Sequence, residues 1–172
     1  MTTKSWIFLT KMTRKRRGSA SVAINESLFV TGGYNDEETS LKSTEYIFLN
    51  KGILPGPDLQ SSRYDHCMVT LPSGLVMIIG GYPPQYLKNA FIFDPNTKLY
   101  NTSTIPPLIH DRANAGCTVF NSPIHDFRPV VLVFGGKNQA SAEVLDFTMS
   151  ANWEESRFIF FVFSYSCKES LA

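Results

Sequence analysis

Three arginines occur at matching places along the chain and are the side chains best suited to bind an anion. Each follows an apolar residue by four positions, in the pairs Met12 and Arg16, Leu59 and Arg63, and Leu108 and Arg112. A guanidinium group presents a planar set of donors that binds a carboxylate or a phosphate through two hydrogen bonds. If the three arginines meet in space, they predict a site for an acidic or phosphorylated peptide. The sequence leaves an alternative open: each arginine braces its own segment by bonding to backbone carbonyls or to neighbours such as Asp65 and Asp111.

The histidines and cysteines form no recognisable catalytic centre. The three histidines, His66, His110 and His125, each precede a cysteine or an aspartate. None of these pairs has the spacing of a zinc site or the signature of a catalytic nucleophile. The sequence also lacks the glycine-rich turn with a lysine that binds phosphates. We therefore expect no enzyme, and no metal or other cofactor.

The overall charge gives no reason to expect a nucleic-acid or membrane partner. The net charge is +1 and charged residues make up 18% of the chain, so no strong field surrounds it. The local exception is a basic run formed by Lys11, Arg14, Lys15, Arg16 and Arg17. Such a run is either a solvated loop or a functional basic patch, and the sequence leaves both interpretations open.

A pair of adjacent glycines ends an apolar stretch three times, which makes this a repeat protein. The doublets are Gly32-Gly33, Gly80-Gly81 and Gly135-Gly136, and they lie 48 and 55 residues apart. A period near fifty is typical of propeller blades rather than of helical repeats.

Each repeat predicts four antiparallel strands. A nearly continuous apolar run leads into the doublet, as in LVMIIGG at 75–81, and indicates a strand buried on both faces. A second apolar segment precedes it, at 21–24, 66–71 and 116–120, and the two form a hairpin, with a longer loop from 121 to 128 in the third. A third strand follows at 46–49, 90–94 and 142–147, and a segment with a bulky aromatic is the outer fourth; Trp6, Tyr100 and Trp153 occupy the position of this aromatic. Four such strands make one propeller blade, so the fold class is all-β.

This register resembles the kelch repeat, whose units carry a double glycine, a following tyrosine and tryptophan, and an arginine that opens the next unit. The resemblance covers roughly residues 5–155 and implies a partial kelch-type β-propeller with about three four-stranded blades. In that family, the loops that enter the first strand and those that follow the double glycine share one face, which commonly binds partners. The resemblance therefore assigns partner binding to Arg16, Arg63, Arg112, Tyr34, Asn35 and Tyr82. Lys137 replaces the tyrosine after the third doublet.

The function that the resemblance implies is a protein–protein interaction module. It is similar to the kelch part of ubiquitin-ligase substrate adaptors or of actin-associated scaffolds, and its partner would be a protein or an acidic peptide. Two alternatives stay open from the sequence: a fragment of a kelch-type carbohydrate-active enzyme, and a truncated product without a function of its own.

The same register divides the chain into segments. Residues 1–15 are expected to hold the end of a preceding blade and a basic loop, the three blades to span 16–62, 63–111 and 112–155, and residues 156–172 to form an irregular apolar tail. Known propellers have about four to eight blades. Three blades therefore suggest a fragment of a longer protein or a homodimer that completes a ring.

The cysteines and the amino-terminal region predict a cytoplasmic or nuclear location. Cys67 and Cys117 fall at nearly matching places in first strands, where we expect free thiols that pack as small apolar side chains. The total of three cysteines argues against a disulfide framework. No secretory signal is visible.

Overall fold

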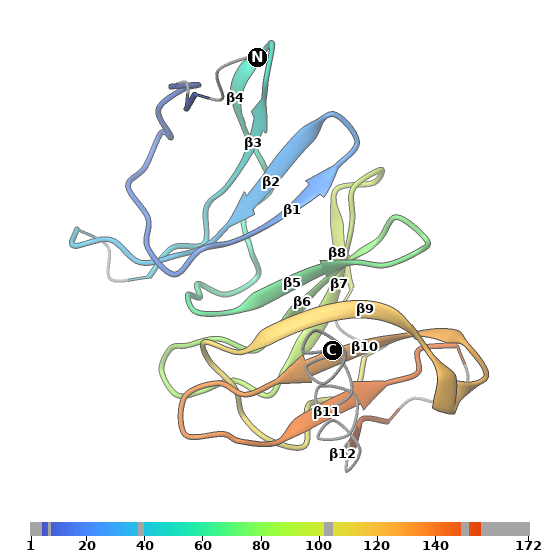
Figure 1. Ribbon diagram of the computed structural model, residues 1–172. Helices are drawn as coiled ribbons and strands as arrows, with labels where there is room; N and C mark the ends of the chain where they lie inside the picture. Colours follow the sequence, from blue (N-terminus) through green and yellow to red (C-terminus); the bar gives the residue numbers. More distant parts are fainter. Residues whose placement is uncertain (1–4, 7, 38–39, 102–104, 149–151, 156–172) are drawn as a thin grey trace.

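Three four-stranded antiparallel sheets make up the computed structural model (Figure 1), which describes residues 5–6, 8–37, 40–101, 105–148 and 152–155. In each sheet the strands follow one another in space in the order of the sequence. The all-β prediction with four strands per repeat is confirmed. The predicted tail at 156–172 lies outside the described residues.

The strands have the following bounds. The first sheet holds β1 (Ala20–Ile24), β2 (Ser27–Thr31), β3 (Thr44–Phe48) and β4 (Gly52–Pro55). The second sheet holds β5 (Cys67–Thr70), β6 (Val76–Ile79), β7 (Ala90–Asp94) and β8 (Leu99–Asn101). The third sheet holds β9 (Gly116–Ser122), a 3-10 turn η1 (Pro123–His125), β10 (Arg128–Phe134), β11 (Ala142–Leu145) and β12 (Glu154–Glu155).

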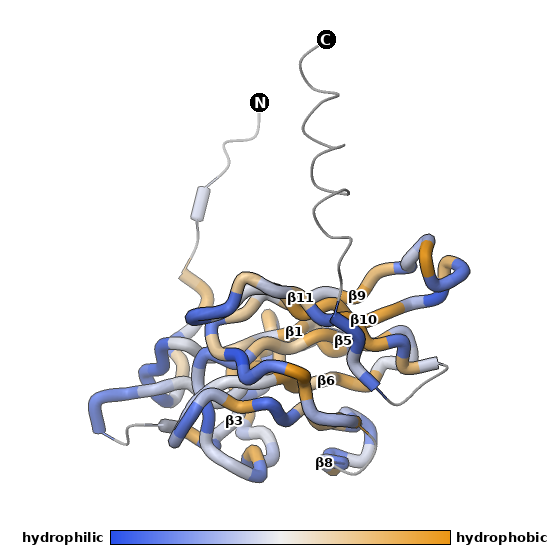
Figure 2. Tube along the Cα trace, turned by 90° about the horizontal axis from the view of Figure 1, so that it is seen from below, coloured by the Kyte–Doolittle hydropathy of each residue, from blue (hydrophilic) through white to orange (hydrophobic). Residues whose placement is uncertain are grey.

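The sheets stack face to face, with the second sheet in the middle. Its inner strand β5 contacts both β1 and β9, the inner strands of the neighbouring sheets. Figure 2 shows apolar residues concentrated along strands such as β6, β9 and β10 and hydrophilic residues in many of the loops. All four residues of β6 are buried, because one face of this strand packs on the first sheet and the other on the third. The outer faces of the first and third sheets are more open, and Leu28 and Phe120 are each 41% exposed.

Two aromatic side chains close the gaps between sheets. The Tyr100 hydroxyl donates to the carbonyl of Pro57 at 2.8 Å, and the Trp153 indole nitrogen donates to the carbonyl of Pro106 at 3.0 Å. Each ring thus covers apolar surface, while its polar atom bonds to the segment that leads into its own sheet. Trp6 has no such role, because its side chain is fully exposed.

The third hairpin is longer than the sequence predicted. Strands β9 and β10 continue to Ser122 and back from Arg128, so the predicted loop at 121–128 shortens to η1 and two residues with left-handed backbone. Only Val131–Phe134 of β10 pairs with β11, and the hairpin extends past the other sheets in Figure 1. Its turn exposes Ile124 and Phe127.

The predicted free thiols are wrong. Cys67 on β5 and Cys117 on β9 form a disulfide that joins the inner strands of the second and third sheets, with their Cα atoms 6.1 Å apart. The two cysteines lie at matching positions in neighbouring repeats, so the stacking of the sheets brings them side by side. The odd number of cysteines had argued against this pairing. The cytoplasmic or nuclear location remains a prediction.

The double glycines link each sheet to the next. The amide of Gly33 donates to the carbonyl of Arg63, and the amide of Gly81 donates to the carbonyl of Arg112, both at 2.8 Å. Gly80 has a φ of +64°, and a Cβ atom there would lie 2.5 Å from the Arg112 carbonyl oxygen. Only glycine combines this left-handed backbone with so close an approach.

We predict that Gly80→Ala destabilises the protein much more than Gly74→Ala. Both glycines have positive φ, but a Cβ at Gly74 meets nothing within 4 Å. Alanine at position 74 should therefore cost only the backbone strain, about 1 kcal/mol, whereas at position 80 the clash should raise the loss to roughly 2–4 kcal/mol. Urea unfolding followed by circular dichroism measures both. Equal losses would show that the contact between sheets does not constrain Gly80.

Candidate functional site

The three repeated arginines are buried beneath the double glycines. Their side chains are at most 1% exposed. A terminal nitrogen of each one donates to the carbonyl of the first glycine in its own repeat: Arg16 to Gly32 at 2.6 Å, Arg63 to Gly80 at 2.9 Å and Arg112 to Gly135 at 2.6 Å. The geometry supports the bracing role that the sequence left open for these residues.

Two of the arginines also hold a buried carboxylate. Arg16 pairs with Glu45, and Arg112 pairs with Glu143 at 2.9 Å. Burial opposes ionisation of Glu45, but hydrogen bonds from Arg16 and Thr13 outweigh it and lower the pKa of Glu45. The sequence had named Asp65 and Asp111 as possible partners, which is wrong: the carboxylates come from the third strands β3 and β11.

The second repeat replaces this carboxylate by an aromatic ring. Phe91 on β7 lies where β3 has Glu45 and β11 has Glu143, and the Arg63 guanidinium stands 4.5 Å from its ring centroid. Burial lowers the pKa of Arg63 to about 10, so the side chain is still a cation at neutral pH. The Arg63 cation is therefore stabilised by a carbonyl oxygen, an amide oxygen and a ring face instead of by a carboxylate.

The surface beside these arginines carries a row of four tyrosines. The ring centroids of Tyr34 and Tyr64 are 5.5 Å apart, those of Tyr64 and Tyr82 are 5.2 Å apart, and those of Tyr82 and Tyr86 are 5.8 Å apart. The first two contacts are edge to face, the geometry that aromatic pairs favour. All four side chains are half-buried. We call Tyr34, Tyr64, Tyr82 and Tyr86 the tyrosine row.

A cation stands at each end of the tyrosine row. The guanidinium of Arg17 lies 4.3 Å from the centroid of Tyr34, and the ammonium of Lys137 lies 5.8 Å from that of Tyr86. The side chain of Arg17 is 72% exposed and Lys137 is exposed as well. The row is thus an aromatic surface that accessible positive charge borders on both sides.

Backbone pairing fixes the positions of the row. Tyr34 and Arg17 exchange two backbone hydrogen bonds, and so do Tyr82 and Tyr64. Each pair joins the residue after a double glycine to the residue after a repeated arginine. Tyr34 and Tyr82 were predicted from the sequence, whereas Tyr64 and Tyr86 were not. The position of Tyr64 directly after Arg63 is the signal that could have found it.

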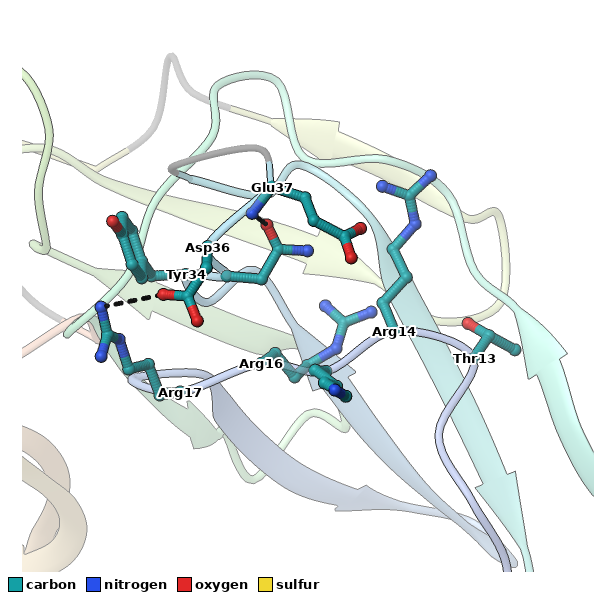
Figure 3. A pocket seen from close by; sticks show the side chains of 9 residues that line it. Thr13, Arg14, Arg16, Arg17, Tyr34, Asp36 and Glu37 are labelled. Carbon is teal, nitrogen blue, oxygen red and sulfur yellow. Dashed lines mark hydrogen bonds and ion pairs between the residues drawn. The ribbon is translucent and has the colours of Figure 1, made fainter.

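A hollow lies near each end of the row. The first, of about 620 Å³, is lined by residues of the basic run together with Tyr34, Asn35, Asp36 and Glu37. Figure 3 shows Arg14, Arg17 and Tyr34 around this hollow and marks the ion pair of Arg17 with Asp36, at 3.6 Å. The second, of about 640 Å³, is lined by Gln85, Tyr86, Leu87, Lys88, Asn89 and Asp111.

Asn35 contributes to the turn beside the first hollow. Its side-chain oxygen accepts the amide of Glu37 at 3.2 Å. Among the predicted partner-binding residues, Tyr34, Asn35 and Tyr82 therefore lie together at the surface, while the three arginines lie beneath it. Contact with a partner remains a prediction for all six residues.

The histidines do not gather into one site. His66 is 6% exposed and its Nε2 atom lies 2.7 Å from the Thr31 hydroxyl. His125 bonds to Ser122 at the far end of the third hairpin, and His110 lies 3.7 Å from Glu155. In the described part of the chain, no three histidine, cysteine or acidic side chains lie close enough together to hold a metal ion.

We predict that Arg112→Met destabilises the protein more than Arg63→Met. Removing Arg112 leaves the carboxylate of Glu143 buried without its cation, which should cost about 3–5 kcal/mol. Removing Arg63 leaves only neutral acceptors unpaired, for about 1–3 kcal/mol. Denaturant unfolding measures the difference, and Glu143→Gln added to Arg112→Met should recover part of the loss. Equal costs would contradict the assigned role of Glu143.

We predict that His66 makes the protein less stable in mild acid. Burial, with the nearby charge of Arg63, lowers the pKa of His66 to about 3 from an ordinary value of 6.5. Between pH 6.5 and pH 3, His66 is therefore protonated in the unfolded chain but neutral in the folded chain. The free energy of unfolding falls as the pH drops through this range. Between pH 7.5 and pH 5 this contribution is about 2 kcal/mol. His66→Gln should remove that part of the pH dependence in urea titrations; an unchanged dependence would contradict it.

The comparisons with known proteins support the repeat. A family model of the kelch motif matches residues 15–47, which include Arg16, the first double glycine, Tyr34 and most of β3. A search of the curated proteins finds no match. No helix within the described residues is long and apolar enough to cross a membrane. The second and third sheets repeat the strand order and the buried arginine of the matched segment, so the chain carries a kelch motif in its first repeat, and its three sheets are consistent with part of a kelch-type β-propeller.

Proposed function

We propose that the chain binds a partner protein across the tyrosine row. Kelch repeats generally serve as protein-interaction modules, and the kelch motif matched at residues 15–47 supports such a module here. The observation that carries the proposal is the row itself: four contacting, half-buried tyrosines with an exposed cation beside each end.

The composition of this surface suits a protein partner. Tyrosine and arginine are enriched among the residues that dominate the energy of protein interfaces. A tyrosine offers a large apolar area and a polar hydroxyl, and it loses little conformational freedom when a partner covers it. Because the neighbouring rings already restrain one another, little further order is needed on binding.

The buried arginines act through the row instead of touching the partner. Arg16 and Arg63 hold the backbone of the double-glycine loops, and the next residues, Arg17 and Tyr64, reach the surface. An alanine variant of either buried arginine would change binding by disturbing the fold. Variants of the tyrosines test the proposal more directly.

A selection from a random-sequence peptide library displayed on phage tests the proposal. We expect selected peptides to bind Tyr34→Ala and Tyr64→Ala at least about tenfold more weakly than the unmodified protein, because both variants remove a ring of the proposed contact. Ile124→Ser is the matched control: Ile124 is also exposed but lies on the turn of the third hairpin, at the opposite end of the strands.

The control should bind as the unmodified protein does, and the thermal midpoints of all variants should confirm that they are folded. Selected peptides that keep their affinity for both tyrosine variants would show that the row is not the binding surface. A selection that yields no binder would also count against the proposal.

A further inference from the structure

We propose that the tyrosine row receives a proline-rich segment in the polyproline II conformation, with an acidic end that lies over Arg17 and the first hollow. The inference rests on the proposed function and names the class of partner. Three features carry it: the spacing of the rings, the phenol hydroxyls and the distribution of charge.

The spacing of the rings fits the repeat of a polyproline II helix. Tyr34 and Tyr82 lie two steps apart in the row, with Tyr64 between them, and the steps are 5.5 and 5.2 Å. A polyproline II helix repeats every three residues, over roughly 9 Å. Two prolines three residues apart can therefore pack against Tyr34 and Tyr82 while the intervening backbone crosses Tyr64.

The hydroxyls complement the backbone of such a segment. A polyproline II helix has no internal hydrogen bonds, so its carbonyl groups seek donors. A tyrosine hydroxyl is protonated at neutral pH and can donate to such a carbonyl. Aromatic grooves that offer such donors are a recurring way to bind preformed proline-rich segments at low entropic cost.

The charges set the direction of the segment. The first hollow is lined by Arg14, Lys15 and Arg17 against Asp36 and Glu37. The pair of Arg17 with Asp36 is exposed and 3.6 Å long, so an incoming carboxylate can replace Asp36 at little cost. At the other end, Lys88 lies opposite Asp111 in the second hollow. Lys137 beside Tyr86 is close enough to Asp65 for the two charges to offset each other. The acidic end of the partner should therefore lie at Arg17.

A single-stranded nucleic acid would also use aromatic rings and cations, but the row is less suited to it. Bases stack on free ring faces. The Tyr34–Tyr64 and Tyr64–Tyr82 contacts instead point the edge of one ring at the face of its neighbour, with interplanar angles of 65° and 60°. The net charge of +1 supplies no general attraction to phosphates.

The test uses synthetic peptides and fluorescence anisotropy. The probe is a labelled peptide of about ten residues, with prolines three residues apart and two glutamates at one end. We expect it to bind the whole chain at least about tenfold more tightly than the same peptide with alanine for proline or with lysine for glutamate. Tyr64→Ala should abolish this preference, whereas Tyr64→Phe, which keeps the ring, should cost only about three- to fivefold. Ile124→Ser should bind as the unmodified protein does.

A charge exchange tests the orientation. Arg17→Glu should weaken binding of the glutamate peptide by about tenfold and improve binding of the lysine peptide. If Arg17→Glu affects both peptides equally, the assigned end is wrong and the inference fails.

Other outcomes separate this inference from the proposed function. If the alanine peptide binds as well as the proline peptide and both depend on Tyr64, the row is an interaction surface but not one for polyproline segments. Tighter binding of a labelled oligouridine than of the proline peptide overturns the inference in favour of nucleic acid. If no peptide binds while the phage selection yields row-dependent binders, the inference fails and the proposed function stands.

Discussion

The structure depends on a buried guanidinium group that holds each double glycine from below. In every repeat this group donates to the carbonyl of the first glycine, and in two repeats it also pairs with a carboxylate from the third strand. One side chain thereby ties the end of the second strand to the segment that enters the sheet. The arginine carbonyls of the second and third repeats accept the second-glycine amides of the sheets before them, so the same residues also join neighbouring sheets. Burying a cation is costly unless it is paired or hydrogen-bonded, so these bonds stabilise the buried guanidinium groups.

The second repeat shows what this arrangement requires. Phe91 replaces the acidic residue, yet Arg63 is still buried and still bonds to Gly80. The constant element is therefore the bond to the glycine carbonyl, and the carboxylate is an addition that two repeats make. The second sheet lies between two others and gains a large apolar side chain that contacts Tyr100 edge to face. The first and third sheets keep the carboxylate, Glu45 or Glu143, in contact with the buried arginine.

Sequence patterns predicted most of the fold, because each strand and turn of the repeat is specified by residues close together in the sequence. Apolar runs, turn residues and glycine doublets give the strand order of all three sheets, and the predicted third strand at 90–94 has the same bounds as β7. The misses are contacts between residues far apart in the chain. The disulfide of Cys67 and Cys117 depends on how the repeats stack, and the pairing of Arg112 with Glu143 depends on how the third repeat folds back on the segment that enters it. The tyrosine row was half predicted: Tyr34 and Tyr82 after the doublets stood out, but Tyr64 between them and Tyr86 beyond them did not.

The alternation of side chains along an extended backbone links the buried arginines to the surface residues that follow them. In an extended chain, successive side chains point to opposite sides. Once Arg16 and Arg63 turn inward, the next residues, Arg17 and Tyr64, must turn outward, and each pairs through its backbone with the residue after a double glycine. The third repeat departs from this pattern: Ala113, which follows its arginine, is only 2% exposed, and Lys137, which follows its doublet, donates its amide to the Ala113 carbonyl and stands as the cation at the end of the row. In the first two repeats, the buried arginine therefore fixes the position of the surface residue that follows it. The type of that residue differs between the repeats, as Arg17 and Tyr64 show.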